Sequence, residues 1–533
     1  MSSLTLLIAA IVMFIAAYLF YGRYVERLLG VDPSKQTPAH TMYDGIDYVP
    51  AKAPVLLGHH FASIAGAAPI IGPIVAAIFG WIPVALWIFF GGIFIGAVHD
   101  FSALIASVRH GGRSIGEVIE EQIGHRGKFF FLIFSWSTLV LVIAVFIIVV
   151  SRTFEEIPAA ASASTLFIFI AVVFGLLLYR LKLPLSVATI IGVLLLIGAL
   201  YTGYIYPVKL TALQWSYLLM VYIFIASVAP VWILLQPRDY LNSFILYALI
   251  ILGVSGIIFV NPSINIPAFT SFYASDTGYL FPILFVTVAC GAISGFHSLV
   301  ASGTSAKQLN NEKDARVIGY GGMLIESLLA VVALITAAML TKENYIQMRS
   351  NPVGIFSHSL GTIMTKLGIS YDAGRTFSSL AVSAFALTSL DTATRLARFA
   401  WQELFFNKNK PMNQQSFFYT NRYAATIVAV VIAGILVVSG QGLKIWPIFG
   451  SANQLLAALA LLAVTVWLTR RKQSSWFVKL PMIFMFVITL SALAVMVYHN
   501  VSVSNYILAI IALLLFLLAS FLAIEAWQSV KKA

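Results

Sequence analysis

The chain has 533 residues, of which 60% are hydrophobic and only 10% are charged, and its mean hydropathy is +0.95. A soluble domain carries roughly a quarter of its residues as charged side chains, so this composition excludes a soluble enzyme or binding module. The net charge of +12 does not indicate nucleic acid binding, because the Lys and Arg residues are scattered among short loops. Composition therefore indicates an integral membrane protein.

Apolar runs of about 20 residues, the length that spans a bilayer as a helix, recur along nearly the whole chain. These runs are too long and too apolar for barrel strands, so helices must satisfy the backbone in lipid. We predict an all-α polytopic protein with about fifteen transmembrane helices. The predicted segments are 4–21, 55–79, 82–109, 128–151, 165–181, 184–204, 214–235, 241–260, 281–303, 316–340, 375–400, 423–439, 447–468, 478–498 and 504–526.

The distribution of basic residues predicts the orientation of these segments. When every segment crosses and the C-terminus is cytoplasmic, most of the 32 Lys and Arg residues fall on the cytoplasmic side, as the positive-inside rule expects. The N-terminus then lies outside. Residues 1–21 lack the positive region of a secretory signal, so we expect a retained first helix, and 1–54 form an extra N-terminal helix and a cytoplasmic loop.

Two of the predicted helices contain residues that interrupt helical structure. In 55–79, prolines remove backbone donors and glycines weaken the helix, whereas 281–303 concentrates Gly, Ser and His. The two segments cross in opposite directions, and each opens a set of seven. Two sets of seven segments that begin in opposite directions predict an inverted repeat. Its halves are 55–260 and 281–533, and the second half includes the terminal helices.

Matching interruptions in two halves are a sequence indicator of a transporter binding site, because unwound carbonyls bind cations and half-helix N-termini attract anions. The alternative is that Pro and Gly only kink two helices or permit close packing. The substrate-binding residues predicted at the interruptions are Gly66, Ala67, Pro69, Gly72, Ser294, Gly295, His297 and Ser298.

An ionisable side chain inside the bilayer costs free energy, so each one is a candidate for a functional or a pairing role. Glu326 is the most central carboxylate, and we predict that it carries a proton; a neutral structural carboxyl is the alternative. Asp100 follows His99 and could instead pair with an arginine at its helix end. Asp391 could pair with Arg395, four residues later on one helix. His297 could also be a packing histidine.

A membrane enzyme is the competing class of protein. The nine histidines form no metal-binding box, and no HExxH, GxSxG or P-loop motif is present. Cys290 is the only cysteine, so we predict no Cys-based metal cluster, and we predict no metal and no cofactor. A passive channel or facilitator stays open as an alternative, although a pore explains paired interruptions less directly.

Several motifs resemble those of the carbon starvation protein A family. They include Gly58-His-His-Phe-Ala-Ser-Ile-Ala-Gly, Pro69-Ile-Ile-Gly-Pro, Gly96-Ala-Val-His-Asp-Phe, Arg109-His-Gly-Gly-Arg-Ser-Ile-Gly-Glu, Ser294-Gly-Phe-His-Ser, Ser389-Leu-Asp-Thr-Ala-Thr-Arg and Trp446-Pro-Ile-Phe-Gly-Ser-Ala-Asn-Gln-Leu-Leu. Together these motifs are specific, and they extend over most of the chain.

The resemblance implies a transporter of the bacterial cytoplasmic membrane, within the amino acid–polyamine–cation superfamily, with a LeuT-like fold. It implies uptake of peptides, or of pyruvate with protons, during carbon starvation. The coupling proton or sodium ion would then bind near hydroxyls of 375–400 that face the first interrupted helix. With the carboxylates above, the predicted coupling residues are Thr388, Ser389, Asp391, Thr392, Glu326, Asp100 and His99.

Overall fold

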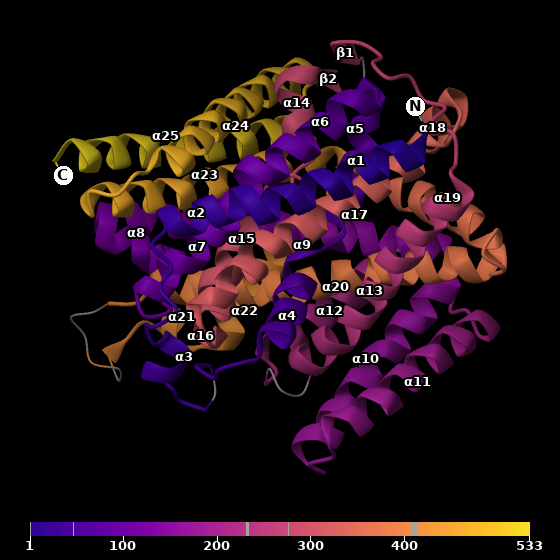
Figure 1. The fold of residues 1–533 in the computed structure, drawn as a ribbon, viewed down its shortest axis with the longest axis horizontal. Helices are drawn as coiled ribbons and strands as arrows, with labels where there is room; N and C mark the ends of the chain where they lie inside the picture. The colour runs from indigo at the N-terminus through magenta and orange to yellow at the C-terminus, as the bar shows by residue number, and fades with distance from the viewer. Residues whose placement is uncertain are drawn as a thin grey trace.

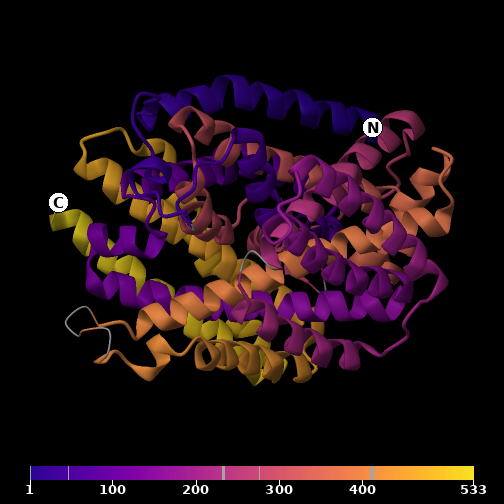
Figure 2. The same cartoon turned by 90° about the horizontal axis from the view of Figure 1, so that it is seen from below.

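The computed structural model describes residues 2–45, 47–230, 234–274, 277–407, 411 and 414–532. Its long helices run side by side along one axis, which is horizontal in Figure 1 and again in Figure 2. One continuous hydrophobic core extends through most of the bundle. The short antiparallel sheet of β1 (Tyr273–Ala274) and β2 (Gly278–Tyr279) lies in a loop between helices.

Among the described residues, the first part of the chain forms thirteen α-helices in order. They are α1 (Ser3–Ala16), α2 (Gly22–Leu28), α3 (Pro38–Thr41), α4 (Ala53–Ile64), α5 (Ala68–Ala76), α6 (Trp81–Gly91), α7 (Ala97–Arg109), α8 (Ile115–Ile123), α9 (His125–Glu156), α10 (Pro158–Tyr179), α11 (Leu185–Ile205), α12 (Ala212–Val228) and α13 (Leu235–Val260). Short π-helical turns join α1 to α2 and α6 to α7, so each of these pairs continues as one rod.

The second part follows the sheet with twelve further α-helices within the residues that the structure describes. They are α14 (Leu280–Thr287), α15 (Gly295–Val300), α16 (Ala306–Gln308), α17 (Gly322–Ala338), α18 (Lys342–Met348), α19 (Pro352–Thr365), α20 (Tyr371–Leu404), α21 (Phe417–Thr420), α22 (Arg422–Val438), α23 (Trp446–Arg470), α24 (Trp476–Ser502) and α25 (Tyr506–Lys532).

Polar side chains at the helix starts explain several of these boundaries. Ser114 accepts a hydrogen bond from the backbone of Glu117 at the start of α8, and Ser370 does the same for α20. At α12, Thr211 and Gln214 bond reciprocally to each other's backbone N–H groups and form a capping box. Such caps satisfy N–H groups that have no partner within the helix.

Ten helical spans of the described chain are long and apolar enough to cross a membrane, or eleven when α4 and α5, bent by 48°, count as one span. The protein is therefore a multi-pass membrane protein. Each of the fifteen predicted segments coincides with a helix or a broken helix, although 231–233 of segment 214–235 lie outside the described residues. Fifteen crossings stay a prediction. Helices α12 and α22 are shorter than the test of length and hydropathy requires, and the helices of segments 281–303 and 375–400 do not pass that test.

Both predicted interruptions are present as breaks between helices. The first break is 65–67, between α4 and α5, and the second is 288–294, between α14 and α15. The extent of each break corrects the sequence prediction. Pro69 and Gly72 lie within α5, where Pro69 occupies one of the first two positions and its missing N–H costs little, and Ser298 lies within α15.

The two broken helices lie against each other. A Cβ atom on Gly72 of α5 would lie 2.6 Å from the carbonyl oxygen of Thr287, the last residue of α14, so only glycine allows this approach. On the other side of the breaks, Nδ1 of His60 in α4 lies 2.8 Å from the hydroxyl of Ser305, which ends the turn after α15. The halves therefore pair as α5 with α14 and α4 with α15, in antiparallel directions.

Candidate functional site

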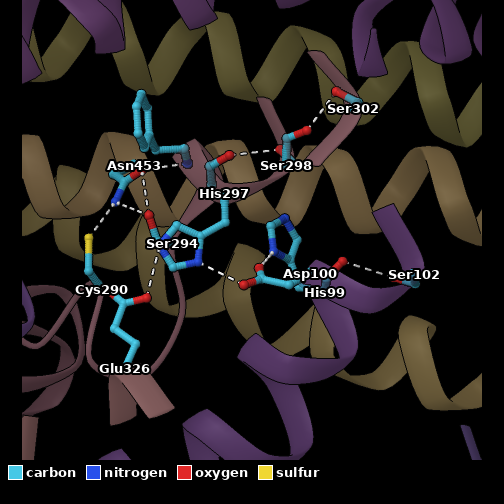
Figure 3. A network of polar contacts seen from close by, with 12 residues as sticks. His99, Asp100, Ser102, Cys290, Ser294, His297, Ser298, Ser302, Glu326 and Asn453 are labelled. Atoms are coloured by element: carbon cyan, nitrogen blue, oxygen red, sulfur yellow. Dashed lines mark hydrogen bonds and ion pairs between the residues drawn. The ribbon is translucent and has the colours of Figure 1, made fainter. Parts of the chain in front are cut away.

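A buried polar cluster lies where the second break meets α7 and α17. Nδ1 of His297, in the first turn of α15, is 2.8 Å from Oδ2 of Asp100 in α7. The other oxygen of Asp100 is 2.7 Å from Nδ1 of His99. On its opposite side, Nε2 of His297 is 3.3 Å from a carboxylate oxygen of Glu326 in α17. Figure 3 shows His297 between the two carboxylates.

Asn453 of α23 holds the second break against this cluster. Its side-chain oxygen accepts a hydrogen bond of 3.0 Å from the backbone N–H of Phe296, and its amide nitrogen donates to Ser294 at 3.0 Å. The same amide nitrogen lies 3.6 Å from the sulfur of Cys290 (Figure 3). Asn453 thus supplies the cap for α15, whose own N-cap residue makes no side-chain cap bond.

The cluster is sealed from solvent and incompletely satisfied. His297, Glu326 and Asp100 are each 0% exposed. Nε2 of His297 and both carboxylate oxygens of Glu326 have no hydrogen-bond partner among the described residues. Buried polar atoms without partners are costly, and here they face one another. This arrangement is suited to hold a proton or a cation.

The first break faces α20 through one close contact. A Cβ atom on Gly66 would overlap the hydroxyl of Ser389, so the glycine lets this hydroxyl approach the unwound backbone. Ser389 is almost fully buried, and Thr392 lies three residues further along the same helix face. Two of the predicted coupling hydroxyls therefore lie beside the first break.

Asp391 has partners other than the predicted Arg395. Its Oδ2 atom pairs with the guanidinium of Arg238 in α13 and accepts a 2.7 Å hydrogen bond from Tyr222 in α12. Arg395 instead donates to the backbone carbonyls of Ala226 and Ala229 at 3.0 and 2.7 Å. The alternative interpretation, in which Asp391 pairs with Arg395 along one helix, does not hold in the described structure, because the partners of Asp391 come from neighbouring helices.

The structure therefore divides the predicted coupling residues into two groups. His99, Asp100 and Glu326 join His297, which was predicted as a substrate ligand, whereas the residues of α20 lie elsewhere. In α20, Thr388 accepts a 2.8 Å hydrogen bond from Asn242 of α13. Asp100 does not pair with Arg109, whose guanidinium is 2.8 Å from Glu312.

Two cavities approach the breaks from different ends of the helices. Cavity A, about 450 Å³, contains in its lining His59, Ser63, Asp239, Ser302, Thr392 and Arg395. Cavity B, about 950 Å³, contains Ile71, Arg152, Thr287, Arg349, Lys444 and Trp446. Ser63 and Thr392 bring cavity A close to the first break, and Thr287 brings cavity B to the edge of the second. Gly66, Ser294 and His297 line neither cavity within the described residues.

Sequence reasoning missed several residues of these sites. Cys290 was noted only as a lone cysteine, and Asn453 only as part of a motif, although an amide inside the apolar segment 447–468 is itself a signal of a buried polar contact. Arg238 was missed because it lies between the predicted segments 214–235 and 241–260, in a connection where a basic residue usually marks the cytoplasmic side.

Comparison with solved structures shows a similar fold. A manganese transporter from Eremococcus coleocola superposes with a TM-score of 0.54 over 91% of this chain and 99% of that chain, at 11% sequence identity. At this identity the similarity concerns the fold alone.

Sequence comparison identifies the family. The "Peptide transporter CstA" of Bacillus subtilis is 33% identical over 100% of this chain and 98% of its own length. The "Pyruvate/proton symporter BtsT" of Escherichia coli K12 is 31% identical over 94% of this chain and 82% of its own length. Residues 2–355 and 346–492 match the family described as "Carbon starvation protein CstA". The chain thus belongs to the carbon starvation protein CstA family of membrane transporters.

Proposed function

We propose that this protein is a secondary active transporter that imports small carboxylated nutrients together with a coupling cation. The observation that carries this proposal is the meeting of two broken helices, α4–α5 and α14–α15, in antiparallel directions inside the bundle. Discontinuous helices of this kind form the substrate and ion sites of many secondary transporters. The proposed fold is a LeuT-like inverted repeat with halves 55–260 and 281–533.

The coupling cation is proposed to bind at the first break. Unwound backbone at 65–67 offers carbonyl oxygens, and the hydroxyl of Ser389 lies directly against Gly66. Thr392, one turn along α20, lines cavity A, so a row of hydroxyls leads from the cavity to the break. Hard cations prefer oxygen ligands of this kind.

Substrate is proposed to enter through cavity B as an anion or as a molecule with a carboxylate. Its lining includes Arg152, Arg349 and Lys444, and no described residue of the lining is acidic. A cavity with one sign of charge concentrates ligands of the opposite sign. Helix α5, which contributes Ile71 to the lining of cavity B, begins at the first break without a side-chain cap. The N–H groups at such a helix start can bind a carboxylate.

The names of the relatives suggest the substrate classes, which are peptides and pyruvate. For this chain we propose uptake of one or both in the bacterial cytoplasmic membrane, linked to carbon starvation. Cavity B then faces outwards, cavity A faces the cytoplasm, and the C-terminus is cytoplasmic. The opposite positions of the two termini in Figure 1 support an odd number of crossings.

Uptake by the purified full chain in proteoliposomes tests this function. Labelled pyruvate and a labelled dipeptide are offered under an imposed proton gradient, an imposed sodium gradient, or neither. We expect accumulation above the equilibrium level with one gradient only. Ser389→Ala should reduce gradient-driven accumulation at least tenfold, whereas Ser255→Ala, a hydroxyl on α13 that bonds only to its own helix, should not.

Equilibration without accumulation would overturn the proposal and favour a passive channel or facilitator. Accumulation that Ser389→Ala leaves unchanged would retain the transporter but remove the cation site from the first break. Uptake of neither substrate, by protein that is folded and inserted, would contradict the substrate class.

A further inference from the structure

Three potential metal ligands meet at the second break. The sulfur of Cys290, an imidazole nitrogen of His297 and a carboxylate oxygen of Glu326 all lie within 4.8 Å of one another, and all three residues are buried. We propose that they bind a divalent transition-metal ion, for which Zn²⁺ is the best match. This inference goes beyond the proposed transport function and differs from the sequence prediction of no metal.

The distances suit a metal ion with three protein ligands. Zinc binds nitrogen and oxygen ligands at about 2.0–2.2 Å and thiolate sulfur at about 2.3 Å in a tetrahedron. Neighbouring ligand atoms of such a tetrahedron are about 3.3–3.7 Å apart by these bond lengths. Nε2 of His297 and the nearer oxygen of Glu326 are 3.3 Å apart, which is the length of such an edge. The fourth position would be open to water or another ligand.

Two of the three ligands present atoms without a hydrogen-bond partner to the proposed ion. Nε2 of His297 and both oxygens of Glu326 are buried and make no hydrogen bond within the described chain. An ion placed between them would bind Nε2 of His297 and one oxygen of Glu326 at once. Native proteins rarely leave several buried polar atoms facing one another unless an ion or a ligand completes the site.

A second layer of hydrogen bonds orients the ligands. Asp100 lies 2.8 Å from Nδ1 of His297, so the ring directs Nε2 towards the proposed ion. His99 lies against the other oxygen of Asp100 at 2.7 Å and fixes that carboxylate in turn. Asn453 donates towards the sulfur of Cys290 at 3.6 Å. A carboxylate behind a histidine ligand and hydrogen bonds to the other ligands are typical of metal sites.

Charge balance favours a divalent ion over an empty site. A thiolate and a carboxylate carry two negative charges, which one divalent cation neutralises. Isolated charges are costly in a low-dielectric interior, and the ion offsets the charges of these two ligands, while the carboxylate of Asp100 keeps His297 and His99 as its own partners. The sulfur ligand selects against Mg²⁺ and Ca²⁺, which prefer oxygen, and favours Zn²⁺, Co²⁺ or a related transition metal.

The proposed metal site is separate from the proposed coupling site. Cys290, His297 and Glu326 come from the second break and α17, whereas Gly66 and Ser389 come from the first break and α20. Metal binding can therefore fail while gradient-driven uptake succeeds, and the reverse. The ion would connect the second broken helix to α17, a structural role that needs no turnover.

Cobalt binding to the full-length protein in detergent tests this site. Because Cys290 is the only cysteine of the sequence, a thiolate-to-cobalt charge-transfer band in the near ultraviolet can arise from this residue alone. We expect one Co²⁺ per chain with this band, and its displacement by one equivalent of Zn²⁺. Elemental analysis of protein purified without chelator should show about one zinc per chain.

Variants with matched controls distinguish a site from unspecific binding. Cys290→Ser should remove the charge-transfer band, and His297→Asn and Glu326→Gln should each weaken binding by at least a hundredfold. Asp100→Asn should weaken it by about 10–100-fold, as expected for an outer-shell carboxylate. The controls are His60→Asn, which removes a buried histidine bonded to Ser305, and Glu312→Gln, which removes a buried carboxylate bonded to Arg109. Neither control should change the cobalt affinity.

Absence of the band and of stoichiometric metal in folded wild-type protein would overturn the proposal. So would binding that His297→Asn and Glu326→Gln leave unchanged. If Glu326→Gln abolishes proton-driven uptake while wild-type protein binds no metal, the cluster is a proton site, and the inference is wrong.

Discussion

Asp391 and Glu326 are both buried carboxylates on long helices, but their surroundings differ. Asp391 shares one oxygen between the guanidinium of Arg238 and the hydroxyl of Tyr222. Glu326 has a histidine nitrogen at 3.3 Å and no hydrogen bond to either oxygen in the described structure. Asp391 is thus bonded through one oxygen to side chains of two other helices, although its Oδ1 atom has no hydrogen-bond partner in the described structure, whereas neither oxygen of Glu326 has one.

This difference teaches that a carboxylate inside a membrane helix does not by itself mark a functional site. A paired carboxylate can hold helices together, and one with unpaired oxygens is where an ion, a proton or a ligand is expected. The predictions below test this contrast by removing each kind of interaction in turn.

The largest effect is expected from breaking the Asp391–Arg238 pair. Asp391→Asn removes one of the two carboxylates that pair with the buried guanidinium of Arg238 and leaves Asp239 at 3.2 Å, so the loss should be about 3 kcal/mol, the low end for a broken buried ion pair. Thermal unfolding in detergent measures this change. Asp372→Asn removes an exposed carboxylate from the same helix and should have little effect. Equal melting temperatures for the two variants would show that the pair does not stabilise the fold.

A smaller loss is expected when the cap of α15 is removed. Asn453→Ala deletes the hydrogen bonds to Phe296 and Ser294 and leaves a buried backbone N–H unsatisfied, which should cost about 1–3 kcal/mol. Asn500→Ala serves as control, because this buried asparagine donates only to a carbonyl of its own helix. Hydrogen exchange should rise at 295–300 only in the first variant, and unchanged protection there would contradict the capping role.

The contact between Gly66 and Ser389 should respond to a single methyl group. Gly66→Ala places a Cβ atom against the Ser389 hydroxyl, which should destabilise the protein by about 1–3 kcal/mol through overpacking. Adding Ser389→Ala removes that hydroxyl and should restore part of the stability. As control, Gly198→Ala in α11 meets no atom within 4 Å and should be neutral or slightly stabilising. Failure of the double variant to recover would locate the strain elsewhere.

The smallest effect is expected at Glu326 in metal-free protein. Glu326→Gln keeps the shape of the side chain and replaces the 3.3 Å ion contact with His297 by an amide contact, while His297 keeps Asp100 as its partner, so stability should change by less than about 1 kcal/mol. Thermal unfolding after chelation measures this value beside that of Asp391→Asn. A loss as large as that of Asp391→Asn would show that Glu326 is paired, and the contrast between the two regions would disappear.

Much of the fold follows from local sequence signals. Apolar runs place the helices because lipid requires them, glycine with proline marks the first break, and a concentration of Gly, Ser and His marks the second. The exact extents could not be predicted, since Pro69 is compatible with the start of a helix and Gly72 serves a contact with Thr287 that depends on tertiary packing.

The candidate sites were predicted only in part. Their predicted depth in the membrane identified Glu326, Asp100 and Asp391 as unusual. It could not show which residues of other helices contact them. Arg238 and Asp391 are 153 positions apart, and Asp100 and His297 are 197 apart. Such pairings are set by helix packing, and one sequence contains no direct signal of them. For the same reason Cys290 appeared isolated.

The placement of the two chain ends at opposite extremes of the bundle has a practical consequence (Figure 1). If the helices cross a bilayer along their common axis, a reporter fused to the first residue and one fused to the last are exposed to different compartments. A protease added to sealed vesicles would then remove one reporter and spare the other. A single digestion would reveal the sidedness of the reconstituted protein before any uptake measurement is interpreted.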